Sequence, residues 1–185
     1  MITIDPSGIV LVIFYMITLT FLLLITKIRK KRIYSIDFFV QATFILYLMM
    51  LAKYTLLPIR LFADADISAA TYFQLTPLTS ILFYLQNLDV PVYGIQLFGN
   101  LILLLPFAIY LNIKKQRSLM FNIITPIIIS LSIETLQLLI DFITQFPNKI
   151  FDVDDLLLNV AGFLIGALLS KYARAIIGSL KLRLQ

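Results

Sequence analysis

Long apolar segments are the feature of this sequence that most limits its fold. The first, residues 9–26, is followed directly by the basic run KIRKKR. About 20 apolar residues in a helix cross the hydrocarbon core of a bilayer, and the chain as a whole is 61% hydrophobic and only 14% charged. These observations predict an integral membrane protein. Because the positive charge follows the first segment and does not precede it, the pattern favours a membrane helix over a cleaved signal peptide.

Five such segments predict an all-α membrane fold in a single domain, residues 1–185. A further segment, residues 72–86, is too apolar for a free loop but too short to span, so we expect an interfacial or re-entrant helix there. Pro58 should end the second helix, and Pro106 should kink the third. The spanning helices are expected at about residues 9–26, 36–57, 95–113, 119–140 and 156–177.

The charges predict the orientation of these helices. Twelve of the fifteen lysines and arginines fall in clusters at segment ends, residues 27–32, 114–117 and 171–183. The positive-inside rule then places the N-terminus outside and the C-terminus in the cytoplasm of a bacterial cell membrane. Eight of the ten acidic residues fall on the outer side, Asp64 and Asp66 among them. The same clustering at helix ends argues against nucleic acid as the partner of this basic chain.

Two polar stripes mark the fourth and fifth helices. Ser130, Glu134 and Gln137 recur on one helical face, and Asp141 continues it. A second stripe contains carboxylates, an amide and two glycines. We expect the two stripes to pack against each other and, with Lys53 and Asn100, to form a polar cavity open to the outer side. The second stripe consists of Asp152, Asp155, Asn159, Gly162 and Gly166.

Each stripe also has a purely structural interpretation. Gly162 and Gly166 form a GxxxG motif, which favours close helix packing, and amides such as Asn159 can be interhelical hydrogen-bond partners. The aspartates can serve as an acidic first turn of a helix, and Asp154, which points away from the stripe, is the weakest site candidate. Glu134 is the strongest, because a carboxylate in a membrane helix needs a partner, such as Lys53, Asn100 or a bound ion, or must be protonated. We expect Lys53 to lie in the same cavity.

The residues that are missing also limit the chemistry. The chain has no cysteine and no histidine, which excludes thiol chemistry, haem ligation and histidine-based triads. No cofactor is expected. A metal, if one binds, would be a hard divalent cation on Asp152 and Asp155.

Five motifs in order resemble the VanZ-like family of bacterial membrane proteins. They are KYTLLPI, LTPLTSI, GNLILLLPFAIYL, SLSIETLQ and KIFDVDDLLLNVAGFLIG, which together span residues 53–166. The family often has Arg where Lys149 stands and Gly where Ala108 stands. Lys149 keeps the charge but not the bidentate geometry of Arg. The resemblance implies a cell-envelope protein associated with resistance to the glycopeptide antibiotic teicoplanin.

Three functions fit these observations. The first is binding of a membrane lipid, a lipid-linked wall precursor or a lipoglycopeptide in the outward cavity; teicoplanin itself carries an acyl chain. The second is an enzyme that uses Glu134 as a general base, with or without a metal, on a lipid or polyprenyl-phosphate headgroup. The third, a small transporter, is disfavoured because five helices show no internal repeat. Oligomeric state is not predicted. The candidate ligand-binding residues are Lys53, Asn100, Glu134, Gln137, Lys149, Asp152, Asp155 and Asn159.

Overall fold

A computed structural model describes residues 2–30, 32–33, 35–61 and 72–183. Asp64 and Asp66, which we assigned to the acidic side, lie outside the described residues. Within them, five helical segments are long and apolar enough to cross a membrane, which confirms the predicted fold class. They are α1 (Gly8–Ile28), α2 (Ile36–Leu56), α4 (Pro91–Leu103) together with α5 (Leu105–Asn112), α6 (Leu119–Thr144) and α7 (Val153–Arg183).

The third spanning segment differs most from the sequence-based expectation. It begins at Pro91, four residues before the expected start, since proline is well suited to the first turn of a helix. It is also broken, not merely kinked, at Leu104, two residues before Pro106. Proline has no N–H to continue the ladder and its ring crowds the preceding turn. By contrast, Pro126 lies inside α6 without ending it.

The ends of the last two helices also extend beyond the apolar runs that predicted them. Helix α6 continues to Thr144, and α7 begins at Val153 and runs to Arg183. Polar residues in the first turn of α7 are buried by neighbouring segments, so hydropathy alone placed the start of that helix too late.

The segment expected as one helix at residues 72–86 is helical only in its second half. Its first part is the short strand β3 (Phe73–Gln74), which pairs in parallel with β4 (Phe151–Asp152). After a turn that contains Pro77, helix α3 (Thr79–Gln86) begins. A second pair, β1 (Ile2–Ile4) and β2 (Ile59–Leu61), is antiparallel.

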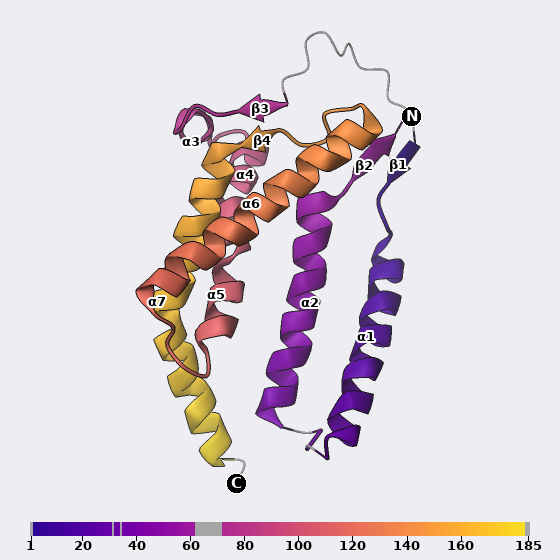
Figure 1. Ribbon diagram of the computed structural model, residues 1–185, viewed down its shortest axis with the longest axis vertical. Coiled ribbons are helices and arrows are strands. Elements are labelled where there is room, and N and C mark those ends of the chain that lie inside the picture. Colours follow the sequence, from indigo (N-terminus) through magenta and orange to yellow (C-terminus); the bar gives the residue numbers. More distant parts are fainter. Residues whose placement is uncertain (1, 31, 34, 62–71, 184–185) are drawn as a thin grey trace.

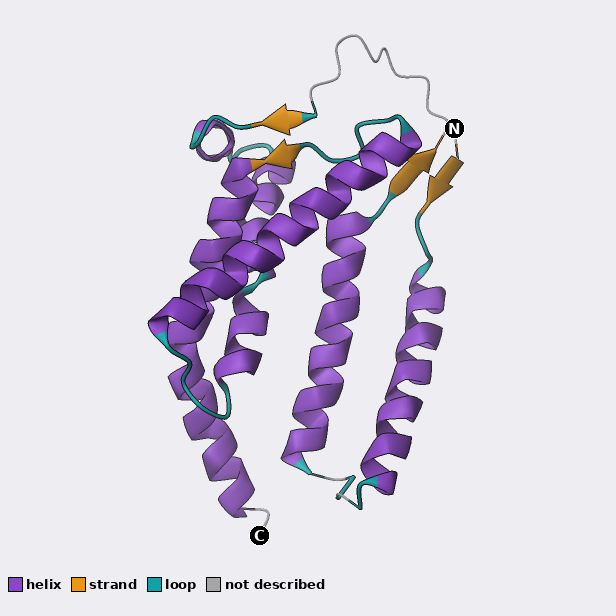
Figure 2. Cartoon of the chain, viewed as in Figure 1, coloured by secondary structure: helices purple, strands orange, loops and turns teal. Residues whose placement is uncertain are grey.

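The two ends of the molecule are different in structure (Figures 1 and 2). All four strands, α3 and the start of α7 gather at the end that carries the N-terminus, which we call the strand end. The C-terminus and the α1–α2 connection lie at the opposite, basic end.

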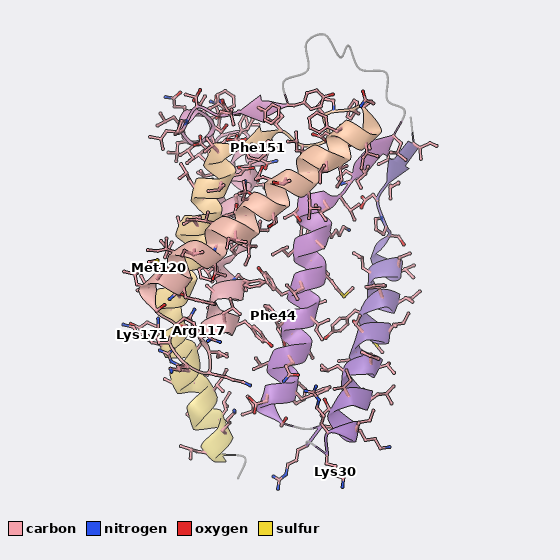
Figure 3. The ribbon with its side chains drawn as sticks, viewed as in Figure 1. Lys30, Phe44, Arg117, Met120, Phe151 and Lys171 are labelled. Carbon is pink, nitrogen blue, oxygen red and sulfur yellow. The ribbon has the colours of Figure 1, made fainter. Side chains whose placement is uncertain are left out.

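Helix α7 is the centre of the packing and contacts α4, α5 and α6. Phe163 and Leu104 are fully buried there, and Ala108 and Ala167 let the helices approach closely. Helix α2 joins this core from the side: Phe44, labelled in Figure 3, stacks on Tyr110 of α5 with ring centroids 3.5 Å apart.

The glycine pair of α7 faces a different neighbour from the one we expected. A Cβ on Gly162 would lie 1.7 Å from the carbonyl oxygen of Leu101 in α4, and one on Gly166 would lie 2.4 Å from that of Leu105. The expectation that these glycines contact α6 is therefore wrong. They pack against the third spanning segment, where their missing side chains allow backbone contact.

Candidate functional site

Polar side chains meet at the strand end, where α6 passes the first turns of α7. The backbone N–H of Asp152 donates to Glu134 Oε2 over 3.2 Å, and Asn159 Nδ2 donates to Ser130 Oγ over 2.9 Å. Glu134 is only 2% exposed. The predicted contact between the two polar stripes is therefore confirmed for their carboxylate and amide members.

Asp154 holds α3 against the start of α7. Its carboxylate accepts hydrogen bonds from the backbone N–H groups of Leu78, Ser80 and Ile81, at 2.6, 2.8 and 3.1 Å. Leu78, which precedes α3, has a positive φ of 68° and supplies no side-chain cap. The buried Asp154 thus satisfies helix N–H groups that would otherwise lack a partner. Asp154 therefore has a structural role, and its place as the weakest site candidate of the three aspartates stays a prediction.

Asp152 strengthens the same junction. One of its carboxylate oxygens accepts from the N–H of Asp154 at 2.8 Å, which caps the first turn of α7. The other accepts from Ser80 Oγ at 2.5 Å. Together with the β3–β4 pairing, these bonds fix the segment that contains β3 and α3 over the cluster.

Asp155 and Asn100 interact with each other, but not through a well-formed hydrogen bond. Asn100 of α4 lies beside the Asp155 carboxyl. Even so, Asn100 Nδ2 and Asp155 Oδ1 are both buried atoms without a well-formed hydrogen bond, as is Asn159 Oδ1. Most buried polar groups in proteins are paired, and an unpaired one costs about 1–3 kcal/mol.

Lys149 is a cation whose charge acts on these acidic residues. Its charge acts on both Glu134 and Asp155, although it forms no ion pair with either. Asp141 fixes the loop that carries it, because Asp141 Oδ1 accepts from the N–H groups of Asn148 at 2.8 Å and Lys149 at 3.4 Å. We define the acidic cluster as Glu134, Asp152, Asp154 and Asp155.

Lys53 and Glu134, which we expected in one cavity, form no ion pair. The charged groups that act most on Glu134 are Asp155, Asp152 and Lys149. Lys53 lies in the last turn of α2. In the same turn, the carbonyl of Thr55 accepts a hydrogen bond from Gln137 Nε2 of α6 at 2.7 Å. Gln137 thus joins α6 to α2 and is directed away from the acidic cluster.

Tyr84 of α3 belongs to the site, although no pattern in the sequence indicated it. Burial, and after it the negative charges of the aspartates, chiefly Asp155, raises the pKa of its phenol to about 12. The hydroxyl therefore stays protonated and remains a hydrogen-bond donor near the cluster. Its ring stacks on Tyr93 of α4 with centroids 5.8 Å apart.

The side chains of the acidic cluster are more buried than we expected for a cavity open to the outer side. Asp154 is fully buried, Asn159 is 1% exposed and Asp152 is 7% exposed. Asp155 and Lys149 are half-buried and mark the accessible edge. Both oxygens of Asp152 are occupied, and the part of the chain that the structure describes contains no group of three or more residues arranged to hold a metal.

Comparison with known proteins identifies the family. The family model VanZ/LLP1 matches residues 44–176, which is most of the chain and includes the whole acidic cluster. The chain belongs to the VanZ/LLP1 family. This confirms the resemblance seen in the sequence. Searches of curated proteins and of solved structures find no match. The region that matches the VanZ/LLP1 model begins within α2. It includes β2 but not α1 or β1.

Proposed function

We propose that this VanZ/LLP1 protein binds an amphiphilic molecule of the bacterial cell envelope at the acidic cluster. The weakly paired Asn100 and Asp155, together with Asn159 Oδ1, which has no partner, carry the proposal. They lie beside the buried Glu134, and the positive charge of Lys149 acts on both Glu134 and Asp155. A site that holds unpaired polar groups gains most from a ligand that pairs with them.

The charge of the cluster indicates what the ligand carries. Four carboxylates with one cation at the edge favour a group that donates hydrogen bonds or bears a positive charge, and they disfavour a bare phosphate. Peptide amides and amines provide such donors. A lipid-linked wall precursor and a lipoglycopeptide such as teicoplanin both join donors of this kind to an acyl or polyprenyl chain, and the surrounding membrane lipids provide the apolar environment for that chain.

Orientation is part of the proposal. The positive-inside rule places the basic end in the cytoplasm and the strand end outside, with the protein in the bacterial cell membrane. Wall precursors after export and antibiotics from the medium both reach the outer face. Resistance of the teicoplanin type would follow if binding at this face altered how the drug anchors in the membrane.

One observation favours an enzyme as a second candidate. Glu134 is buried next to a site edge, an environment in which enzymes place general bases. Against this, Glu134 already accepts the N–H of Asp152, and the chain has neither a histidine nor a motif that would activate a nucleophile. Binding without catalysis is the simpler function for this arrangement.

The experiment compares ligand-induced stabilisation of the purified protein with two matched variants. Asp155→Asn removes one charge from the cluster, and Asp89→Asn removes one from an exposed position near the end of α3. Teicoplanin should raise the unfolding temperature of the wild type and of Asp89→Asn. Loss of a hydrogen bond to a charged group costs about 1.5–3 kcal/mol, so Asp155→Asn should bind at least about tenfold more weakly. Equal binding by both variants would place the ligand elsewhere.

A further inference from the structure

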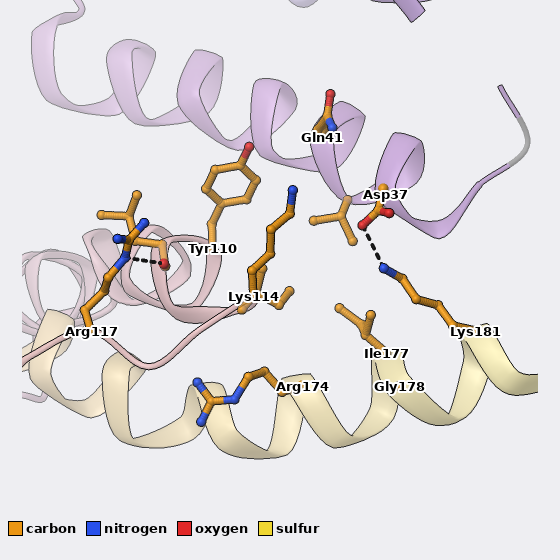
Figure 4. A pocket seen from close by; sticks show the side chains of 12 residues that line it. Asp37, Gln41, Tyr110, Lys114, Arg117, Arg174, Ile177, Gly178 and Lys181 are labelled. Carbon is orange, nitrogen blue, oxygen red and sulfur yellow. Dashed lines mark hydrogen bonds and ion pairs between the residues drawn. The ribbon is translucent and has the colours of Figure 1, made fainter. Parts of the chain in front are cut away.

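A separate cavity lies at the basic end, between α2, α5 and α7 (Figure 4). It encloses about 520 Å³, within the range of roughly 300–1,000 Å³ that is usual for small-molecule sites. We define the basic pocket by its four cationic side chains, Lys114, Arg117, Arg174 and Lys181. Asp37 is the one acid that lines it.

The basic pocket keeps most of its positive charge unneutralised. Asp37 pairs with Lys181 at 2.9 Å, and this is the ion pair found in the described part of the chain. Arg174 donates to two neutral acceptors, the carbonyl of Asn112 and Oε1 of Gln116, both at 2.8 Å. These bonds hold the guanidinium in place without cancelling its charge. A held but uncompensated guanidinium is well suited to an anionic oxygen.

Lys114 extends from the chain after α5 towards α2, and it lines a second cavity as well (Figure 4). That cavity, of about 320 Å³, shares Asp37, Gln41 and Lys114 with the first and adds Arg29 and Arg32 near the α1–α2 connection. The positive field therefore continues from α7 past α2 to α1, and it attracts anions to the shared Lys114.

The apolar walls distinguish a lipid from a soluble anion. Val40, Leu111 and Ile177 line the same pocket as the cations. They belong to or adjoin helices that cross the membrane, so a molecule with its phosphate on Lys114 and Arg174 can keep its acyl chains beside aliphatic side chains. Basic pockets between membrane helices on the cytoplasmic side are suited to anionic headgroups.

We propose that the basic pocket binds the phosphate headgroup of an anionic phospholipid. This site is independent of the acidic cluster, because the two lie at opposite ends of the molecule (Figure 1).

Native mass spectrometry of the whole protein in detergent tests the proposal with three probes: phosphatidylglycerol, phosphatidylcholine and inorganic phosphate. Neighbouring lysines provide matched variants, since Lys114 lines the pocket and Lys115 does not. We expect retention of phosphatidylglycerol over phosphatidylcholine. Each basic residue near an anionic surface contributes about fivefold to binding, so Lys114→Gln should weaken retention of phosphatidylglycerol about fivefold and Lys115→Gln should not.

A second pair checks the result, because Arg174 also holds α5 to α7. Arg174→Gln should weaken phosphatidylglycerol retention, whereas Lys171→Gln, on the same helix but outside the pocket, should not. Equal losses in the Lys114 and Lys115 variants would overturn the site. Equal retention of the two lipids would overturn the anionic preference. Displacement of phosphatidylglycerol by inorganic phosphate at similar concentration would show that the occupant is a soluble anion and overturn the lipid.

Discussion

Removing the Asp154 carboxylate should release α3 from the strand end while leaving the helical core folded. Asp154→Ala deprives three backbone N–H groups, those of Leu78, Ser80 and Ile81, of their acceptor. Hydrogen bonds to charged groups contribute about 1.5–3 kcal/mol each, but three bonds that share one carboxylate are not additive. We therefore expect a total near 3 kcal/mol, which shifts the equilibrium between docked and released α3 by about 100-fold.

Hydrogen exchange followed by mass spectrometry measures the release of α3 directly. In Asp154→Ala, amides of residues 78–86 should exchange about 100-fold faster, while those around Phe163 in the core should keep their wild-type protection. Asp89→Ala, an exposed acid just beyond α3, is the control and should change neither region. Unchanged protection of α3 in Asp154→Ala would refute the assignment of Asp154 as its anchor. Equal loss of protection throughout would show that the effect is global unfolding.

Three further predictions concern packing, charge and orientation. Gly162→Ala places a Cβ 1.7 Å from a backbone oxygen and should destabilise the protein by about 3 kcal/mol or more in detergent unfolding. Gly99→Ala, with open space around it, should be neutral or slightly stabilising. Similar unfolding free energies for the two variants would contradict the α4–α7 contact. Glu134→Gln keeps the size and hydrogen bonding of the side chain, so it should preserve membrane abundance but lower any teicoplanin resistance that the wild type confers; full resistance at normal abundance would make Glu134 purely structural. A reporter fused after Gln185 should be active only in the cytoplasm, and activity only outside would reverse the proposed orientation.

The bilayer explains why most of the fold could be predicted from the sequence. A membrane segment must satisfy its backbone internally and present apolar side chains, so each spanning helix leaves a long hydrophobic run. The polar stripe that contains Glu134 was visible for the related reason that a carboxylate in such a run demands a partner. Periodicity then placed Ser130 on the same face, and the structure shows it bonded to Asn159 across the interface.

The sequence could not show which residues contact each other in the site, because these contacts join segments that are far apart in the chain. Asp154 bonds to Leu78, 76 residues earlier in the chain, and neither residue carries a periodic signal for the other. Which helix the glycines of α7 face depends on how the helices are arranged in space, and hydropathy does not show that arrangement. Likewise, the charge of Lys149 acts on Glu134 from a loop whose path Asp141 fixes, and no periodic signal connects these residues.

The most direct test of the central claim is the mass of whatever remains bound at the acidic cluster. Native mass spectrometry of wild-type protein purified from membranes should show a bound amphiphile with amine or amide donors. That adduct should be lost in Asp155→Asn and kept in Asp89→Asn, while phosphatidylglycerol bound at the basic end stays in both. An adduct retained equally in both variants would contradict binding at the acidic cluster.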